Sequence, residues 1–193
     1  MLKPMLSQYV FREKMTYTGN ELRPHWLLER SGVYGSVIGV FRGPCRVETN
    51  ALVDWEDRLA GDSIGAAEML HFVAELFGLS LEAGVFAQRL FMVWAERILV
   101  EKGHHVVRKG DDLYWNHLKL SVSIATVSPV SVLIHWGINI DATGAPPTVR
   151  AGGLNSLIGN SDEAIFGFAK ELCAQYIGEL EEISIAQCKV RPV

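Results

Sequence analysis

The spacing of apolar side chains along the chain predicts three helices. Residues 81–102 keep their polar side chains on a narrow stripe and are apolar elsewhere, which indicates a largely buried helix. Residues 161–182 repeat apolar side chains at helical spacing after a serine that can cap the first turn. The same spacing predicts a helix over residues 64–77, with Asp62 or Ser63 as its N-cap and a glycine after its end.

Short runs rich in β-branched and aromatic residues predict the strands. The predicted strands are residues 14–18, 35–41, 104–108, 113–116, 119–127 and 131–140, with partly strand-like sequence over 47–54. The sequence RGPC predicts a turn after Phe41, and LRPHWLLER predicts a turn that leads into a short helix. The glycine- and proline-rich segment 142–160 is long for a plain connection, which favours a mobile lid or a binding loop.

Composition narrows the class of protein. With 193 residues, of which 49% are apolar and 21% charged, the chain can bury one core, and we expect a single domain over residues 1–193. The net charge is -4 without a run of Lys or Arg, so nucleic acid is not an expected partner. Because the chain has neither a long uncharged apolar stretch nor a signal-peptide pattern, no membrane partner is expected. Three cysteines without CxxC spacing favour the reducing cytoplasm.

Lys119 is the most informative position for chemistry. It follows the acidic turn at Asp111 and Asp112 and precedes two apolar strands. Because strand side chains alternate between faces, its ammonium can be held over a pocket. The alternative is a solvated lysine that blocks pairing at a strand edge. The two aspartates could hold magnesium or a ribose hydroxyl, or simply form the hairpin turn.

Residues 93–141 contain a helix, a strand, an acidic turn followed by Leu-Tyr, a lysine, and two strands that end in Gly-Ile-Asn. This order resembles the catalytic core of biotin and lipoate protein ligases. The resemblance implies an α/β (α+β) fold, with a mixed, mostly antiparallel central sheet flanked by helices, as in class II synthetases. The family's turn lysine, Asn-Asp pair, catalytic lysine and strand-end asparagine fall on Arg108, Asp111 and Asp112, Lys119 and Asn139.

Arg42 and Gly43 resemble the arginine-glycine segment that cradles phosphates in these ligases, which implies ATP with magnesium as cofactor. The chain also departs from the pattern. The Ala-Gly that follows the family's catalytic lysine is Ser121-Val122 here, and the glycine-rich nucleotide loop is replaced by RGPC. Octanoyl transferases of the superfamily carry a cysteine where this chain has Ser131, so a cysteine acyl-enzyme is excluded there. Ser121 and Ser131 remain candidate substrate-binding hydroxyls.

A second resemblance covers nearly the whole chain. It rests on the strings LRPHW, FRGPC, EMLHFVAELF, QRL, GDDL, KLSVSIATVSPVSVLIHWGINI and CKVR. By these strings the chain is identified as a member of the prokaryotic family called domain of unknown function 366. This membership supports the fold and the cytoplasmic location and leaves the chemistry open.

The leading hypothesis is a ligase or acyltransferase that binds a nucleotide or a carboxylate-bearing small molecule between the RGPC turn and the strand of Lys119. The alternative is a non-catalytic small-molecule-binding protein on the same scaffold, which the missing glycine-rich loop favours. A third hypothesis is a protein-interaction subunit. Open sheet edges also allow a homodimer.

Several other side chains have a structural and a functional interpretation. The run DWED, at residues 54–57, could form part of a ligand mouth or a polar loop. His25 and His135 lack the partner spacing of a zinc site and are more typical of structural positions. Cys45 follows a glycine-proline pair, and a buried small residue is favoured there over a nucleophile.

Overall fold

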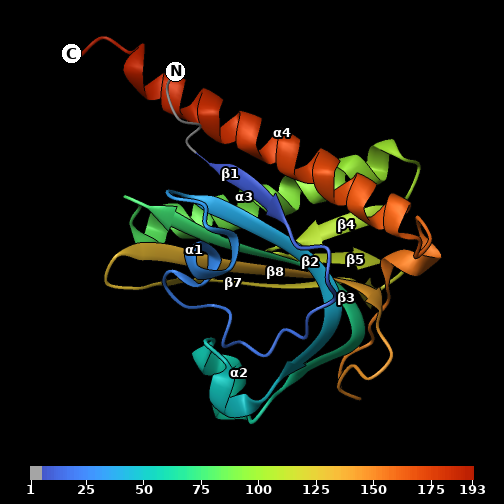
Figure 1. Ribbon diagram of the computed structural model, residues 1–193. Helices are drawn as coiled ribbons and strands as arrows, with labels where there is room; N and C mark the ends of the chain where they lie inside the picture. The colour runs from blue at the N-terminus through green and yellow to red at the C-terminus, as the bar shows by residue number, and fades with distance from the viewer. Residues whose placement is uncertain (1–5) are drawn as a thin grey trace.

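The computed structural model describes residues 6–193, which are organised around a five-stranded sheet (Figure 1). Its strands, in spatial order, are β1 (Ser7–Val10), β2 (Val37–Val47), β3 (Ile64–Phe77), β8 (Ser131–Asp141) and β7 (Ser121–Val127). β1 pairs with β2 in parallel, and the other neighbours pair antiparallel. A smaller antiparallel sheet contains β4 (Val106–Lys109), β5 (Asp112–Trp115) and β6 (Leu118–Lys119). The predicted fold class is therefore confirmed.

Two long helices, α3 (Leu81–Glu101) and α4 (Asp162–Cys188), cover one face of the five-stranded sheet (Figure 1). The core between helices and sheet is aromatic at its centre. Phe91 of α3 stacks on Trp136 of β8 with ring centroids 4.2 Å apart, and Tyr176 of α4 meets both rings edge-on. Such aromatic pairs stabilise a core beyond the area they bury. This packing holds one face of β8 and leaves its other face to the site.

The opposite face of the sheet is covered by the segment between β1 and β2, which includes α1 (Trp26–Ser31). Phe11 of this segment packs edge-on against Phe41 of β2, with ring centroids 6.2 Å apart. At the far ends of β2 and β3 the chain forms η1 (Thr49–Ala51) and α2 (Trp55–Ala60), which project beyond the body of the sheet (Figure 1). The cavity described below lies between this projection and the ends of β7 and β8.

The predictions for the two outer helices are confirmed. α3 matches residues 81–102, and α4 begins after Ser161, whose hydroxyl accepts the backbone N–H of Ala164 at 3.2 Å. α4 continues past residue 182 to Cys188, where the sequence turns polar without a glycine to end the helix. The short helix expected after LRPHW is α1. None of the helices in residues 6–193 has the length and apolar character that crossing a membrane requires.

The predicted helix over residues 64–77 is wrong, because this segment is the central strand β3. β3 lies between β2 and β8, so its residues from Met69 to Leu76 are buried on both faces. A strand buried on both faces loses the alternation of apolar and polar residues and cannot be told from a buried helix by periodicity alone. Gly78, expected to end a helix, ends the strand with positive φ.

The turn predicted at RGPC is also wrong, because β2 runs through this sequence to Val47 and only shifts its register after Gly43. Met15 packs so closely there that a Cβ at position 43 would overlap its carbonyl oxygen. The glycine therefore permits a close approach of two backbone segments. The strand predicted at residues 14–18 is reduced to one bridge at Tyr17, and residues 47–54 are mostly a loop with η1.

Candidate functional site

A cavity of about 320 Å³ opens on the sheet face that α3 and α4 leave free. Its floor contains Met69 of β3, Val122 of β7, and His135 and Asn139 of β8. Lys119 lies at the side, on the short strand β6. The volume is at the lower end of the range typical of sites for small organic ligands.

Segment 142–160 forms one wall of the cavity, through Ala145, Pro146, Thr148, Val149 and Ala151. Two main-chain hydrogen bonds attach this wall to Lys119. The N–H of Lys119 donates to Arg150 O at 2.8 Å, and the carbonyl of Lys119 accepts from Gly152 N at 3.0 Å. The segment is thus a loop with one short turn, η2 (Leu154–Ser156), and it belongs to the cavity as the binding-loop prediction requires. Because of these bonds to β6, segment 142–160 is not a lid that is detached from the sheet.

The ammonium of Lys119 forms an ion pair with Asp112 at 2.8 Å, and both side chains are mostly buried. Burial disfavours the charge of Lys119, but the hydrogen bond and the charge of Asp112 outweigh it, so the pKa of Lys119 is raised. Burial also raises the pKa of Asp112, and Lys119 offsets only part of that effect. Lys119 is therefore a fixed positive charge at neutral pH.

Asn139 places an unpaired acceptor in the cavity lining. Its Nδ2 donates to the carbonyls of Lys119 at 3.3 Å and Gly152 at 3.1 Å, which fixes the orientation of the amide. Its Oδ1 is buried and accepts no hydrogen bond from residues 6–193. A buried acceptor without a donor is unusual in a folded protein and calls for an explanation.

The remaining charges around the cavity are acidic. The lining contains the carboxylates of Asp54, Asp57 and Asp62 from the projection and of Asp111 and Asp112 from the β4–β5 hairpin. Burial and the neighbouring carboxylates raise the pKa of Asp57. The interpretation of DWED as part of a ligand mouth therefore fits the position of two of its aspartates.

His135 of the floor forms a buried pair with His71, which lies outside the lining. His71 Nε2 donates to the carbonyl of Gly43 at 3.2 Å, so His71 Nδ1 carries the lone pair that accepts from Nε2 of His135 at 3.1 Å. Tyr17 stacks on the ring of His135, with centroids 3.7 Å apart. Burial lowers the pKa of His71 to about 4 and, together with His71, lowers that of His135 well below its usual value. Both rings are neutral at physiological pH.

Sequence reasoning missed His71 and Tyr17. The signal for His71 was hidden by the wrong helix at residues 64–77, because strand pairing of β3 with β8 is what brings it beside His135. Tyr17 reaches the site from an irregular segment, whose path no local pattern predicts. His135 itself occupies the structural position that its isolated place in the sequence favours.

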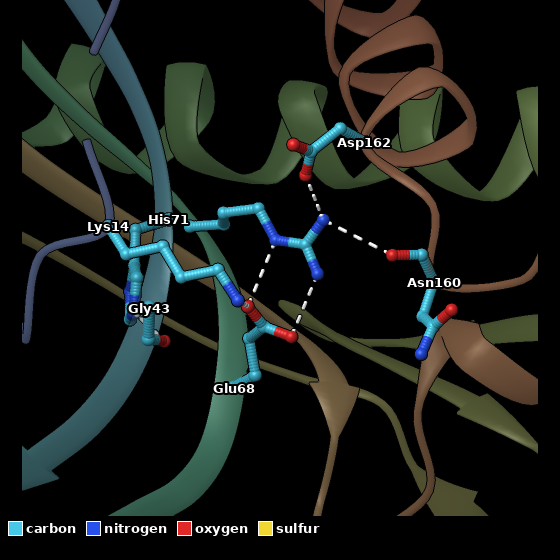
Figure 2. A network of polar contacts seen from close by, with 7 residues as sticks. Lys14, Gly43, Glu68, His71, Asn160 and Asp162 are labelled. Carbon is cyan, nitrogen blue, oxygen red and sulfur yellow. Dashed lines mark hydrogen bonds and ion pairs between the residues drawn. The ribbon is translucent and has the colours of Figure 1, made fainter. Parts of the chain in front are cut away.

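Arg42 does not line the cavity, contrary to the hypothesis that a ligand lies between RGPC and Lys119. Its guanidinium donates to both carboxylate oxygens of Glu68, at 3.0 and 2.8 Å, and to Asn160 O and Asp162 (Figure 2). Lys14 adds a second ion pair to Glu68, at 2.6 Å. Arg42 therefore ties β2 to β3 and to the start of α4. With the bonds to Asn160 and Asp162, this bidentate pair occupies four of the five N–H donors of the guanidinium, so Arg42 is held by protein groups.

Four other predicted residues can be placed directly. Gly43, Arg108 and Ser131 are absent from the cavity lining, whereas Ser121 is part of it. The hydroxyl of Ser121 already accepts the backbone N–H of Leu113 at 2.8 Å. Gly43 lets the backbone of Met15 approach β2 closely, as described above, and the guanidinium of Arg108 donates to the carbonyl of Gly110 in its own hairpin.

Ser131 lies at the opposite end of β8 from Asn139, where its hydroxyl donates to the buried Glu75 at 2.7 Å. Glu75 also accepts the backbone N–H of His25 at 2.9 Å. Ser131 and His25 therefore have structural roles at this end of β3 and β8. The spacing to Lys119 that suggested Ser131 is a spacing in sequence only.

The structure brings together Lys119, Asp111, Asp112, Ser121 and Asn139, which line one cavity. Their binding roles stay predictions. Residues 6–193 contain no group of three or more His, Cys, Asp or Glu side chains placed to hold a metal ion.

Cys45 is buried, and burial together with the nearby charge of Glu21 raises the pKa of its thiol to about 12. A thiol in that state is not a nucleophile at neutral pH.

Comparisons with known proteins agree with this architecture. The structure of a protein of unknown function from Pyrococcus horikoshi is 35% identical, with a TM-score of 0.89, and the match covers 97% of this chain and 99% of that one. The uncharacterized protein MJ0805 from Methanocaldococcus jannaschii is 31% identical over 188 residues, or 94% of this chain and 83% of its own.

Biotin and lipoate protein ligases share the fold at lower similarity. The biotin protein ligase from Leishmania major, solved with biotin, is 13% identical with a TM-score of 0.58, and the match covers 91% of this chain and 74% of that one. The family model described as Domain of unknown function (DUF366) matches residues 6–191. The chain therefore belongs to the DUF366 family and has the fold of the biotin and lipoate ligases.

Proposed function

We propose that this protein binds a small organic acid in the cavity beside Lys119 and serves acyl transfer there, from an activated derivative of the acid to a nucleophilic acceptor, with departure of the activating group. The observation that carries the proposal is the ammonium of Lys119, fixed on the cavity wall by Asp112 at 2.8 Å. The same position carries the catalytic lysine in the ligase pattern. Among the solved structures of this fold, one ligase is described with biotin and one putative ligase with lipoic acid, both of which are carboxylic acids.

A fixed ammonium can serve acyl chemistry in two ways. It pairs with the carboxylate of the acid on binding, and it stabilises the negative charge that grows on the acyl oxygen during transfer. Both effects are stronger at a partly desolvated site than in water, and the side chain of Lys119 is only 29% exposed. Asp112 orients the ammonium, and the main-chain bonds to Arg150 and Gly152 fix its backbone.

ATP with magnesium does not fit the residues present as a ready-made site. Arg42, the expected phosphate ligand, is held by Glu68 and Asp162. The described residues offer no preformed metal cluster, and the cavity lining has more carboxylates than cations. We therefore assign no step to a nucleotide.

A non-catalytic binding protein is the second candidate. It is favoured by the charge around Lys119, because Asp112 already neutralises the ammonium in the absence of a substrate. Such a protein would bind the acid without forming a product.

The test combines binding with turnover. Carboxylic acids of a size that fits about 320 Å³ are screened by thermal shift, with and without ATP and magnesium, and hits are assayed for an acyl product and for pyrophosphate. A ligand at a hundred-fold excess over its Kd stabilises the folded state by about 2.7 kcal/mol. We expect Lys119→Ala to lose both the shift and the product.

Lys170→Ala is the matched control, because Lys170 is exposed on α4 and does not line the cavity. A Lys119→Ala variant that binds and turns over like the parent would refute the proposal. Binding that depends on Lys119 without any product would establish the second candidate instead.

A further inference from the structure

We infer, resting on the function proposed above, that the acid bound in the cavity also carries a protonated nitrogen, which Asp57 and Asn139 hold. The proposed substrate class is thus amine- or amidine-bearing carboxylic acids. Lys119 serves the carboxylate of such a molecule. The rest of the lining is suited to a positively charged hydrogen-bond donor.

The first observation is the unpaired acceptor of Asn139. This residue is 5% exposed, its Nδ2 is used by two backbone carbonyls, and its Oδ1 has no donor among residues 6–193. An exchange of the amide nitrogen and oxygen is ruled out, because both partners of Nδ2 can only accept. Asn139 lines the cavity, so a ligand that brings an N–H group to Oδ1 satisfies it.

The second observation is the charge of the lining, which has five aspartates against the single ammonium of Lys119. Asp112 is paired with Lys119, Asp54 caps α2, and Asp111 accepts from Gln88 at 3.0 Å. The carboxylates of Asp57 and Asp62, by contrast, accept no side-chain or backbone donor from the described part of the chain, and Asp57 is the less exposed of the two.

Asp57 belongs to the same part of the cavity as the lysine. Its charge interacts with that of Lys119 and with that of Asp112. A carboxylate that is partly buried among other carboxylates favours a cation nearby. Because the lining does not form a metal cluster, an organic cation is the better match.

The histidine pair makes the floor an acceptor as well. With the proton of His71 on Nε2 and that of His135 on Nε2, the remaining Nδ1 of His135 carries a lone pair, and it bonds to none of residues 6–193. The floor therefore adds no donor for a second carboxylate. Among the polar side chains of the lining, a diacid would find donors on Lys119 and on the hydroxyls of Tyr17, Thr148 and the serines, whereas the aspartates, Oδ1 of Asn139 and Nδ1 of His135 can only accept.

Three para-substituted benzoic acids test the inference. 4-(Aminomethyl)benzoic acid, 4-(hydroxymethyl)benzoic acid and terephthalic acid share the ring and one carboxylate, and differ in an ammonium, a hydroxyl and a second carboxylate. Binding to the full chain is measured by ligand-observed NMR and calorimetry. We expect the ammonium compound to bind about ten-fold tighter than the hydroxyl compound, as charge-assisted hydrogen bonds predict, and terephthalate to bind most weakly.

Asp57→Asn should reduce the preference for the ammonium over the hydroxyl compound to about one, as expected when the charge assistance is lost. Glu56→Gln is the control, because Glu56 is the exposed neighbour of Asp57 outside the lining, and its variant should keep the preference. A preference that survives Asp57→Asn, or no preference in the parent, overturns the inference. If the panel of simple acids binds through Lys119 while the ammonium brings no gain, only this inference fails; if no acid of either set binds, the proposed function fails with it.

Discussion

The buried pair of His71 and His135 predicts that the protein loses stability between pH 7 and pH 5. Both side chains are almost without exposed surface, and burial lowers the pKa of His71 to about 4 and that of His135 well below its usual value. In the unfolded chain a histidine titrates near pH 6.5. Between these pKa values the unfolded state binds protons that the folded state does not, so the free energy of unfolding falls as the pH falls.

The magnitude follows from the two pKa values of His71. Stability from this group is complete above pH 6.5 and decreases as the pH falls toward 4. At 1.36 kcal/mol for each unit of pKa difference, lowering the pH from 7 to 5 removes about 2 kcal/mol on account of His71 alone. His135 adds to the loss in the same direction, because its pKa is lowered as well.

The assay is urea unfolding of the parent and of His71→Gln at pH 7, 6 and 5. Glutamine can donate to Gly43 O and accept from His135, as His71 does, but it does not titrate. The parent is expected to be more stable at pH 7, and its advantage over the variant should shrink by about 2 kcal/mol by pH 5. Taking the difference in the free energy of unfolding between the two proteins at each pH removes the contribution of the carboxylates that titrate in both.

His105→Gln is the control for this experiment. His105 is exposed, so its substitution removes a histidine without touching the buried pair. A gap between the parent and His71→Gln that does not change with pH would refute the reasoning. The result would mean that His71 is charged, or hydrated, in the folded protein.

Three further predictions concern stability and reactivity. Glu68→Ala leaves the buried guanidinium of Arg42 with the exposed Asp162 as its remaining carboxylate partner, so it should lower the free energy of unfolding by about 3 kcal/mol. In the same urea titration, loss of the exposed Glu13 should change the free energy of unfolding by less than about 1 kcal/mol. Gly43→Ala should prevent stable folding, because the added Cβ would overlap a neighbouring backbone. Gly167→Ala lies on the surface of α4 with open space around it, and should raise the free energy of unfolding by about 0.5 to 1 kcal/mol. Denaturation midpoints that shift in the same direction for both variants would contradict this pair of predictions. Of the three cysteines only the exposed Cys188 should react with a thiol reagent in the native state, and fast labelling of a second one would show that a thiol is accessible.

The sequence predicted the fold best where local and tertiary signals agree. The hairpin that carries Asp112 and Lys119 is bounded by a Gly-Asp-Asp turn and follows a long helix, so its elements appear in order in the sequence. The prediction for β3 was wrong because its sequence pattern reflects burial on two faces and does not indicate which strands it pairs with. One wrong element then hid the partner of His135.

The site was predicted in part for a similar reason. Asp112, Lys119, Ser121 and Asn139 lie on the consecutive strands β5 to β8, Asp111 lies in the turn before β5, and strand pairing brings them to one cavity. Segments far apart in sequence supply the rest, and contacts of that kind leave no local pattern. Arg42 of the RGPC sequence lies outside this cavity for an energetic reason: the arginine is buried, and a buried cation pairs with the carboxylates that tertiary packing offers.

If the aspartates of the projection hold the ligand as inferred above, the projection at the ends of β2 and β3 separates recognition from folding. Asp54, Asp57 and Asp62 lie on this outlying tip, and none of them contributes to either apolar core (Figure 1). Substitutions there can change which charge the protein selects while the sheet and its helices stay intact. Homologues that differ at these three positions and keep the scaffold would thus be expected to prefer different molecules.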